Sequence, residues 1–357
     1  MGKPIKEYMM EQPEMMRRLS IEIGENIREV IQCVGKEFER IFLVGSGTSL
    51  NAALAARYVF EAYIQAEVQV FAPFDFLHYF PDKRLDGRTL LLGISQTVRS
   101  KGTIDCVEKA RAAGAKTVFV TAEPENDGVR SAHTVLDTCT GEELVGAKTK
   151  GFTSTMAALY ALAGGLAGKN VDLSGVSVLQ EAALRETGLQ IDELVKEFAQ
   201  ASSITLVGCG PVMAAVKEGG LKLLETVRIP VETYDVEEYM HGPYHCLEND
   251  SYMIFLAPPG AGQERMEKLL QFVEEITPHT LVLGNAGFVW KNAKNYSLAL
   301  PEADEILAPL YYVIPIQWLA VETTVAKGRR PEVSRYPEFH KALGSKFMPK
   351  VNYYTGI

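Results

Sequence analysis

Short runs of aliphatic and β-branched residues alternate with longer stretches of helical period along this chain. In the first half the apolar runs are 40–44, 67–71, 89–94 and 116–120, and a helix is predicted to begin at about Asn51. Strands that alternate with helices are typical of parallel sheets covered by helices. The pattern therefore predicts an α/β fold whose sheets carry helices on both faces, a three-layer αβα arrangement.

The second half of the chain repeats this pattern. The aligned pairs, each 163 residues apart, are Ile41 with Ile204, Leu90 with Met253, Thr117 with Thr280 and, in a loop, His78 with His241. A spacing kept by three strands and a loop indicates an internal duplication. The expected organisation is an N-terminal arm (1–25), a first α/β domain (26–175), a helical linker (176–202), a second α/β domain (203–327) and a C-terminal tail (328–357).

The two copies differ where the strand at 89–94 ends. The first copy continues with Ser95, Gln96 and Thr97, whereas the second has 258–260, which reads Pro-Pro-Gly. Ligands of open parallel sheets bind beyond the carboxyl ends of the strands. We therefore expect the first copy to bind the polar end of the ligand.

Two polar loops of the first copy are suited to an anion. Gly47-Thr48-Ser49 follows a strand and opens a helix, so its N–H groups and hydroxyls can bind phosphate, although a plain capped turn fits equally well. Leu50 stands where a dinucleotide-binding loop needs its third glycine, and no P-loop lysine follows. The second loop adds hydroxyl and amide groups from Ser95, Gln96, Thr97 and Ser100.

The second copy supplies groups that could move protons. Glu218, Lys222 and Glu225 share one helical face, which is either a solvated ion-pair stripe or a functional set. The intervening 219–220 glycine pair favours close approach of another group. His241 and His245 have metal-ligand spacing, but the Gly-Pro break between them disfavours a metal and favours proton transfer by His241.

Composition narrows the functional class. The net charge of −9 and pI near 5.4 argue against nucleic-acid or anionic-membrane partners. Five cysteines without a Cys-x-x-Cys pair predict neither a disulfide framework nor a zinc cluster and suit a cytoplasmic protein. No secretory signal is apparent at the N-terminus, and the apolar run at 306–321 is interrupted by two prolines, so it is expected to be core.

These residues together resemble a known family. The chain is similar to the sugar isomerase (SIS) double-domain proteins, in particular the isomerase half of glutamine:fructose-6-phosphate aminotransferase, stand-alone amino-sugar-phosphate deaminases and fructosamine-6-phosphate deglycases. The resemblance covers nearly the whole chain, and the segments that carry it are 11–13, 47–49, 95–97, 149–153, 218–225, 241–243 and 305–317. It implies two tandem SIS domains.

The resemblance also implies roles for single residues. Glu225 would move a proton between C1 and C2 of the sugar, His241 would assist ring opening, and Lys222 would orient the open-chain sugar. The histidine commonly reaches a neighbouring subunit's site in this family, which implies a homodimer or higher homo-oligomer with shared sites. No metal or cofactor is implied. The residues expected to bind the sugar phosphate are Gly47, Thr48, Ser49, Ser95, Gln96, Thr97 and Ser100.

Some positions depart from the aminotransferase pattern. No glutaminase segment precedes the repeats and Met1-Gly2 offers no cysteine nucleophile, so glutamine-dependent amination is not expected. Arg99 adds positive charge to the phosphate loop, which would suit a substrate carboxylate or merely pair with a surface acid. The ending at 346–353 is similar to that of the deglycase branch, which implies a C-terminal catalytic lysine at Lys350.

The leading hypothesis from the sequence is a cytoplasmic deglycase. It would convert a 6-phosphorylated ketosamine, fructosamine 6-phosphate, into an amine and hexose 6-phosphate. An isomerising deaminase that releases ammonia from glucosamine 6-phosphate is the first alternative, and a sugar-phosphate sensor without catalysis is the second. A sensor needs only the phosphate-binding loops, so the presence of Lys222, Glu225 and His241 favours an enzyme.

Overall fold

The structure is a computed structural model that describes residues 3–347, and these form two compact units. Unit 1 contains residues 14–174 and the returning segment 333–347, and unit 2 contains residues 4–13 and 175–332. Segments distant in the sequence thus complete each unit, because the first helix joins unit 2 and the C-terminal segment joins unit 1.

Unit 1 is built on a five-stranded sheet in which every pairing is parallel. The strand order is β2-β1-β3-β4-β5, and all six residues of β3 are buried, as expected for a central strand covered on both faces. The strands are β1 (Arg40–Val44), β2 (Glu67–Phe71), β3 (Thr89–Ile94), β4 (Lys116–Thr121) and β5 (Thr134–Asp137).

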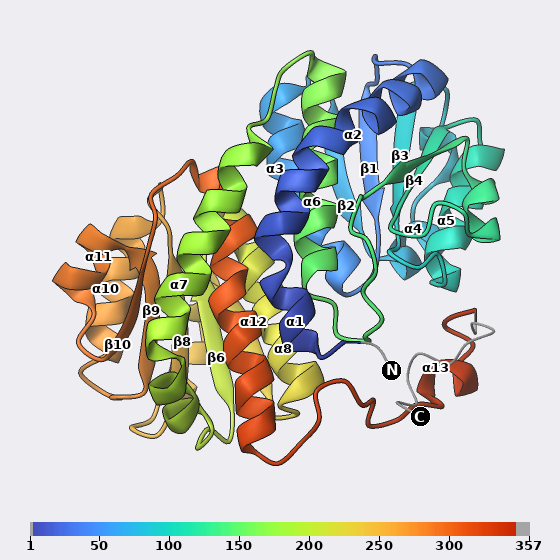
Figure 1. Cartoon of the computed structure of the whole chain (residues 1–357). Coiled ribbons are helices and arrows are strands. Elements are labelled where there is room, and N and C mark those ends of the chain that lie inside the picture. Colours follow the sequence, from blue (N-terminus) through green and yellow to red (C-terminus); the bar gives the residue numbers. More distant parts are fainter. Residues whose placement is uncertain (1–2, 348–357) are drawn as a thin grey trace. The chain divides into compact units, whose positions relative to one another are not determined.

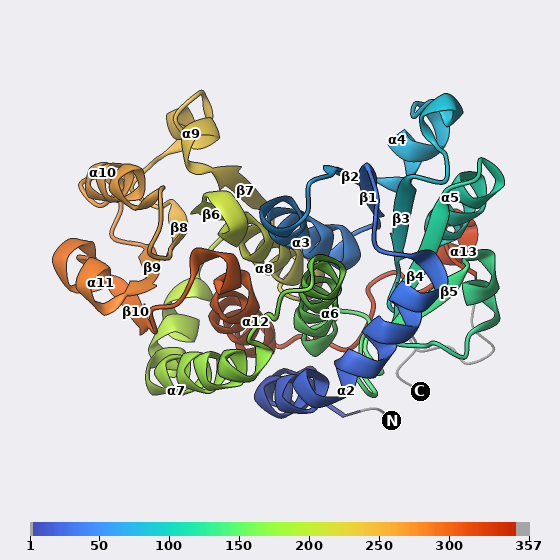
Figure 2. The same cartoon turned by 90° about the horizontal axis from the view of Figure 1, so that it is seen from above.

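Helices cover both faces of this sheet. In Figure 2 the strands of unit 1 stand between α3 and α6 on one side and α5 on the other. On the α5 side, Phe42, Phe76 and Phe119 form the core. The helices of unit 1 are α2 (Gln12–Val34, which begins in the last residues of the N-terminal segment of unit 2), α3 (Thr48–Tyr63), α4 (Pro73–His78), α5 (Lys101–Ala112), α6 (Lys150–Ala167) and α13 (Phe339–Ala342).

Unit 2 has a second parallel sheet with the same topology. Its order is β10-β9-β8-β6-β7, which matches the order of unit 1 when read from β7 (Figure 2; Figure 1 shows β10, β9, β8 and β6). The strands are β6 (Ile204–Gly208), β7 (Val231–Asp235), β8 (Tyr252–Ala257), β9 (Thr280–Asn285) and β10 (Tyr296–Leu300). The helices are α1 (Ile5–Met10), α7 (Leu173–Phe198), α8 (Met213–Thr226), α9 (Val236–Tyr239), α10 (Gln263–Val273), α11 (Ala286–Asn292) and α12 (Pro309–Ala326).

Helix α12 is the core helix of unit 2. Among the described residues, the segment Glu305–Ala326 is the one helical stretch long and apolar enough to cross a membrane, but 78% of it is buried within the protein. Its buried Gln317 accepts a hydrogen bond of 2.9 Å from the equally buried Gln12 amide, which fastens the N-terminal segment to the helix. The expectation that the apolar run at 306–321 is core is confirmed.

The duplicated three-layer α/β fold expected from the sequence is confirmed. The four predicted runs of the first copy match β1 to β4 to within one residue, and the helix expected from about Asn51 begins at Thr48. The fifth strand, β5, was not predicted. The N-terminal segment is divided between the two units, with residues 4–13 in unit 2 and α2 from Glu14 in unit 1. The segment expected as a helical linker is the long helix α7, which belongs to unit 2 from Gly175.

Candidate active site

The two polar loops of unit 1 leave the same edge of the sheet. Strands β1 and β3 pair in parallel with Val44 opposite Gly93, so the loops that follow them start side by side. In the first loop Gly47 has φ +56°, a conformation that favours glycine. A Cβ on Gly45 would lie 3.0 Å from the Ser49 Cβ, so this turn also needs its first glycine.

The second loop is fixed by hydrogen bonds to its neighbours. The Gln96 carbonyl accepts bonds from the Thr121 hydroxyl (3.0 Å) and the Ala122 N–H (3.1 Å), beyond the end of β4. Val98 adopts φ +47° although it is β-branched, and its side chain is buried. Strained backbone of this kind persists only where the surroundings enforce it, and it is frequent at ligand-binding sites.

Three hydroxyls in these loops are available to a ligand. The side chains of Ser49, Ser95 and Thr97 have no hydrogen-bond partner within the part of the chain that the structure describes. Ser49 and Ser95 are only 8% and 7% exposed, and buried hydroxyls are usually hydrogen-bonded. Ser100, by contrast, already accepts a bond of 3.1 Å from Thr103. The arrangement can therefore donate several hydrogen bonds to one phosphate group.

The start of α6 forms another wall of this site. The Gln96 side chain donates a hydrogen bond of 3.2 Å to Thr155 and lies against Gly151, where any Cβ would overlap the amide. The buried Glu143 carboxylate caps the helix by accepting bonds from the N–H groups of Thr149 (2.7 Å) and Gly151 (2.9 Å). Sequence reasoning missed Glu143, because the glycine of the 149–153 segment signals only the close approach of Gln96.

The C-terminal segment of unit 1 pairs with the second polar loop, residues 95–100. The Phe347 N–H donates to the Arg99 carbonyl (2.9 Å), the Lys101 N–H donates to the Ser345 carbonyl (3.3 Å), and Ser100 forms an antiparallel bridge with Lys346. The C-terminal segment thus reaches this loop by residue 347. Lys350 lies outside the described residues.

In unit 2 the three charged residues of α8 form one contact network. The Lys222 ammonium lies 3.1 Å from the Glu218 carboxylate and 2.7 Å from the Glu225 carboxylate. Glu218 and Lys222 are 0% and 2% exposed, whereas Glu225 is 38% exposed. A solvated ion-pair stripe would expose all three side chains, so that alternative does not describe this helix.

The electrostatics of this network keep Lys222 charged. Burial by itself lowers the pKa of the Lys222 ammonium, but the adjacent Glu218 and Glu225 carboxylates outweigh it and raise the pKa above its ordinary value. Lys222 therefore cannot act as a base near neutral pH. Its ammonium instead holds the Glu225 carboxylate in position by a hydrogen bond of 2.7 Å.

The glycine pair on α8 is explained by packing. A Cβ on Gly219 would lie 2.7 Å from the Ile316 side chain on α12, and one on Gly220 would lie 2.5 Å from the Thr233 side chain on β7. The helix is thus wedged between α12 and the sheet with no room for larger residues. The close approach expected at these glycines comes from the protein itself, and it fixes the position of Lys222.

His241 lies at the other edge of the sheet of unit 2. Helix α8 runs back from the end of β6 toward the start of β7, which places Glu225, on its last turn, near the amino ends of the strands. His241 follows β7 and α9, at the carboxyl ends, and is exposed. Gly242, at φ +131°, then breaks the backbone. No contact joins His241 to Lys222 or Glu225 in the part of the chain that the structure describes.

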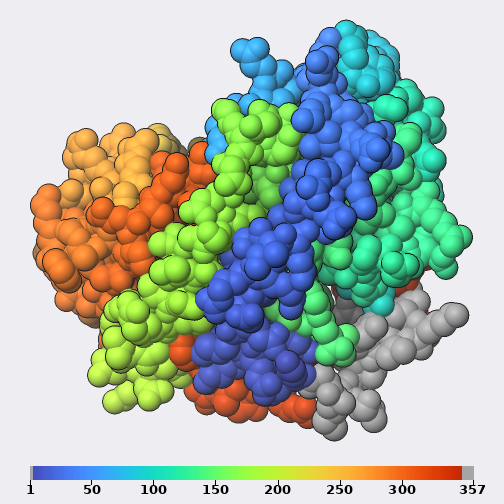
Figure 3. Space-filling view, turned by 45° about the horizontal axis from the view of Figure 1, so that its top comes forward, coloured from blue at the N-terminus to red at the C-terminus, as the bar shows by residue number. Residues whose placement is uncertain are grey.

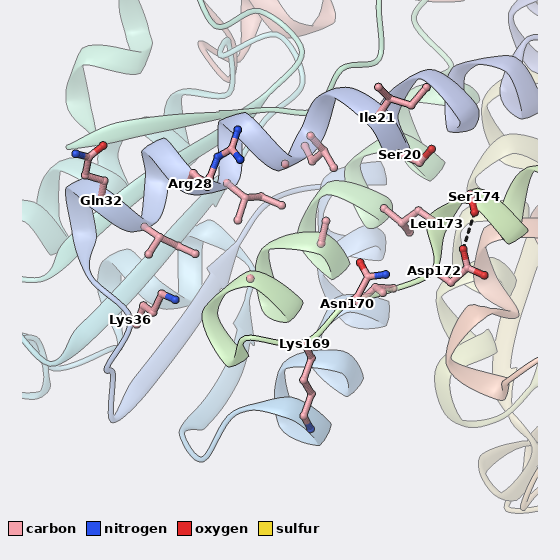
Figure 4. Close-up of a pocket in the computed structure, with 17 residues that line it drawn as sticks. Ser20, Ile21, Arg28, Gln32, Lys36, Lys169, Asn170, Asp172, Leu173 and Ser174 are labelled. Atoms are coloured by element: carbon pink, nitrogen blue, oxygen red, sulfur yellow. Dashed lines mark hydrogen bonds between the residues drawn. The ribbon is translucent and has the colours of Figure 1, made fainter.

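A separate cavity of about 650 Å³ lies in unit 1 between α2 and the end of α6 (Figure 4). Its lining includes Ile27 and Arg28 from the exposed helix α2, whose outer face is visible in Figure 3, and Asn170 and Asp172 beyond α6. Because α2 leads into the start of β1, this cavity is at the edge of the sheet opposite to the polar loops. It contains none of the residues expected in the active site.

Comparison with known proteins gives a consistent result. Residues 36–164 and 197–327 match the SIS domain family. Among curated relatives, the glutamine–fructose-6-phosphate aminotransferase (isomerizing) of Methanothermobacter thermautotrophicus is 29% identical over 329 residues, which are 90% of this chain and 54% of that protein. The chain thus spans about half the length of this relative.

Solved structures resemble the whole described chain. A candidate phosphosugar isomerase from Clostridium difficile 630 has a TM-score of 0.86 and 25% identity, covering 98% of this chain and 100% of that chain. The C-terminal domain of glucosamine-fructose-6-phosphate aminotransferase from Francisella tularensis has a TM-score of 0.82 and 22% identity, covering 92% and 97%. The second likeness bears on the fold alone.

Proposed function

Because the chain belongs to the SIS domain family, we propose that it is an isomerase-type phosphosugar enzyme that releases an amine from a 6-phosphorylated ketosamine. The second product is hexose 6-phosphate. The phosphate binds to the hydroxyl-rich loops of unit 1, where Ser49, Ser95 and Thr97 have unused donors. The amine leaves from C1 after the carbonyl function has moved from C2 to C1.

Glu225 carries the proton transfer in this mechanism. Its carboxylate removes a proton from C1 of the open-chain ketosamine while the C2 oxygen takes up a proton, giving an enaminol. Glu225 then returns its proton to C2 while the amine nitrogen loses one, giving the aldose imine. Water then adds to the C1 imine carbon, and cleavage of the C–N bond releases the amine and leaves the aldehyde. The transfer requires Glu225 within hydrogen-bond reach of both carbons and in its carboxylate form.

The contact between Lys222 and Glu225 carries the proposal. The Lys222 ammonium, 2.7 Å from the Glu225 carboxylate, fixes the position of the group that would accept the proton. Glu225 is partly exposed while Lys222 and Glu218 are buried beneath it, so only the basic group of the network is accessible to a ligand. A sensor would need the phosphate loops but would have no use for a charged network of this kind.

NMR spectroscopy of the purified protein in D₂O tests this function. Incubation with a fructosamine 6-phosphate conjugate is expected to release the free amino acid and hexose 6-phosphate with deuterium at C2. Ammonia release from glucosamine 6-phosphate, without reaction of the conjugate, would make the protein a deaminase. Binding of the sugar phosphate without hydrogen exchange or turnover would contradict the proposal and indicate a sensor.

We expect the released amine to be an amino acid, whose carboxylate the Arg99 guanidinium would bind. Arg99 belongs to the hydroxyl-rich loop that follows β3, its side chain is 15% exposed, and its guanidinium lies 3.7 Å from the Glu123 carboxylate. Replacing Arg99 with leucine is expected to raise KM about tenfold or more for an amino-acid conjugate, the size of one lost charge-assisted hydrogen bond. KM for a conjugate of a neutral amine should change little.

The exposed Arg130 provides the matched control for this change. It pairs with Asp127 in the same unit, and both side chains are more than 80% exposed. Arg130→Leu removes the same charge without approaching the phosphate loop, so neither KM is expected to move. Equal losses with both conjugates in Arg99→Leu would show that Arg99 supports the loop and does not recognise the amine.

His241 is proposed to act in the site of a second subunit. Within one chain it lies at the opposite edge of the sheet from Glu225, so a site that uses both needs His241 from another copy. Mixed Glu225→Gln and His241→Ala variants would then recover about one quarter of the wild-type activity, because half the dimers are mixed and each has one intact site. Activity that stays at the level of the separate variants would contradict shared sites.

A further inference from the structure

One glycine of the unit 2 loops that correspond to the phosphate-binding loops has kept its backbone conformation. Gly210 has φ +59°, close to the +56° of Gly47, its equivalent 163 residues earlier. The donors have changed, because residues 258–260 carry no hydroxyl or amide side chain. What remains in unit 2 is a backbone cradle between the end of β6 and the start of α10.

This cradle is already filled by a carboxylate of the same chain. Glu305 begins the short 3₁₀ helix Glu305–Leu307 that leads into α12. A Cβ on Gly260 would overlap the carboxyl carbon and both carboxyl oxygens of Glu305, and one on Gly210 would lie 3.2 Å from Oε1. The Glu305 carboxyl group therefore rests directly on both glycine loops.

The surroundings of this carboxylate affect its charge. Burial raises the pKa of Glu305, and the Ala261 backbone opposes that rise. The Glu305 carboxylate thus bears the desolvation that any anion held in this cradle would bear.

We propose that Glu305 is a built-in anion that occupies a vestigial phosphate site of unit 2, so that each chain binds a phosphate group in unit 1 only. Glu305 thereby excludes phosphate monoesters, and their analogue inorganic phosphate, from unit 2. Tethering favours the internal carboxylate, because it is present at an effective concentration of about millimolar or more. In unit 1 the buried Glu143, one residue from the equivalent position, caps α6 instead.

The test measures inorganic phosphate binding to the full chain by isothermal titration calorimetry and ³¹P NMR. Glu305→Ala is expected to gain a phosphate site that the parent protein lacks. Adding Gly260→Ala to this variant should abolish the new site, because the alanine Cβ fills the position of the missing carboxyl group. No added site in a folded Glu305→Ala protein would overturn the inference.

The statement that each chain has one phosphate site rests on the proposed function, which places that site in unit 1. The site of unit 1 and the blocked site of unit 2 are therefore tested separately. In a background with Ser95→Ala and Gln96→Ala, phosphate binding in unit 1 is removed, and any binding gained with Glu305→Ala belongs to unit 2. A parent chain that binds no phosphate would contradict only the proposed function. Should Glu305→Ala fail to fold, Glu305→Ser, which removes the carboxylate and keeps a small polar side chain, must gain the site for the inference to stand.

Discussion

Glu225→Gln is expected to lower kcat for ketosamine cleavage by about 10²- to 10⁴-fold, the usual contribution of a positioned general base. The amide has nearly the same size as the carboxylate and can still accept a hydrogen bond from Lys222, now 2.7 Å from Glu225 Oε2. It cannot accept the C1 proton. Binding of the sugar phosphate, which we assign to unit 1, should therefore change by less than about twofold.

Glu264→Gln is the matched control for this experiment. Glu264 also pairs with a lysine of its own helix, at 2.7 Å from Lys268, but both side chains are largely exposed. Removing this charge should leave kcat unchanged. Deuterium exchange at the sugar carbons distinguishes loss of proton transfer from a defect in the later release of the amine. Glu225→Gln should abolish the exchange as well as the turnover. Full turnover in Glu225→Gln would remove Glu225 from the mechanism.

The fold could be predicted from the sequence because local pattern and global structure agree in it. Buried strands such as β3 are continuous apolar runs, and the duplication places the same runs at one fixed spacing. The glycines beside Lys222 were also informative, because a glycine pair inside a helix costs stability and calls for a packing reason. The structure supplies that reason in Ile316 and Thr233.

Contacts between segments distant in the sequence could not be predicted in this way. Nothing in the local pattern indicates that 345–347 pairs with the phosphate loop, or that Glu305 folds over Gly260. Two glutamates at similar places in the two repeats, Glu143 and Glu305, take different partners, and only packing decides between them. The separation of His241 from Glu225 follows from helix direction, which a strand-helix-strand argument can supply.

The largest expected effect on stability comes from Lys222→Met. Methionine fills a similar volume, but it leaves the Glu218 carboxylate, which is 0% exposed, without its cationic neighbour. Breaking one partner of a buried ion pair costs about 3–5 kcal/mol, whereas losing an exposed pair such as Lys268–Glu264 costs about 0–1 kcal/mol. Urea unfolding should therefore show a large shift for Lys222→Met and little for Lys268→Met.

Tryptophan fluorescence can follow this unfolding in unit 2 alone. The chain has two tryptophans, Trp290 and Trp318, and both belong to unit 2, where Trp318 is buried. Adding Glu218→Gln to Lys222→Met removes the unbalanced charge, so the double variant should recover most of the lost stability while remaining inactive. A double variant less stable than Lys222→Met alone would show that Lys222 stabilises α8 by packing and not by neutralising Glu218.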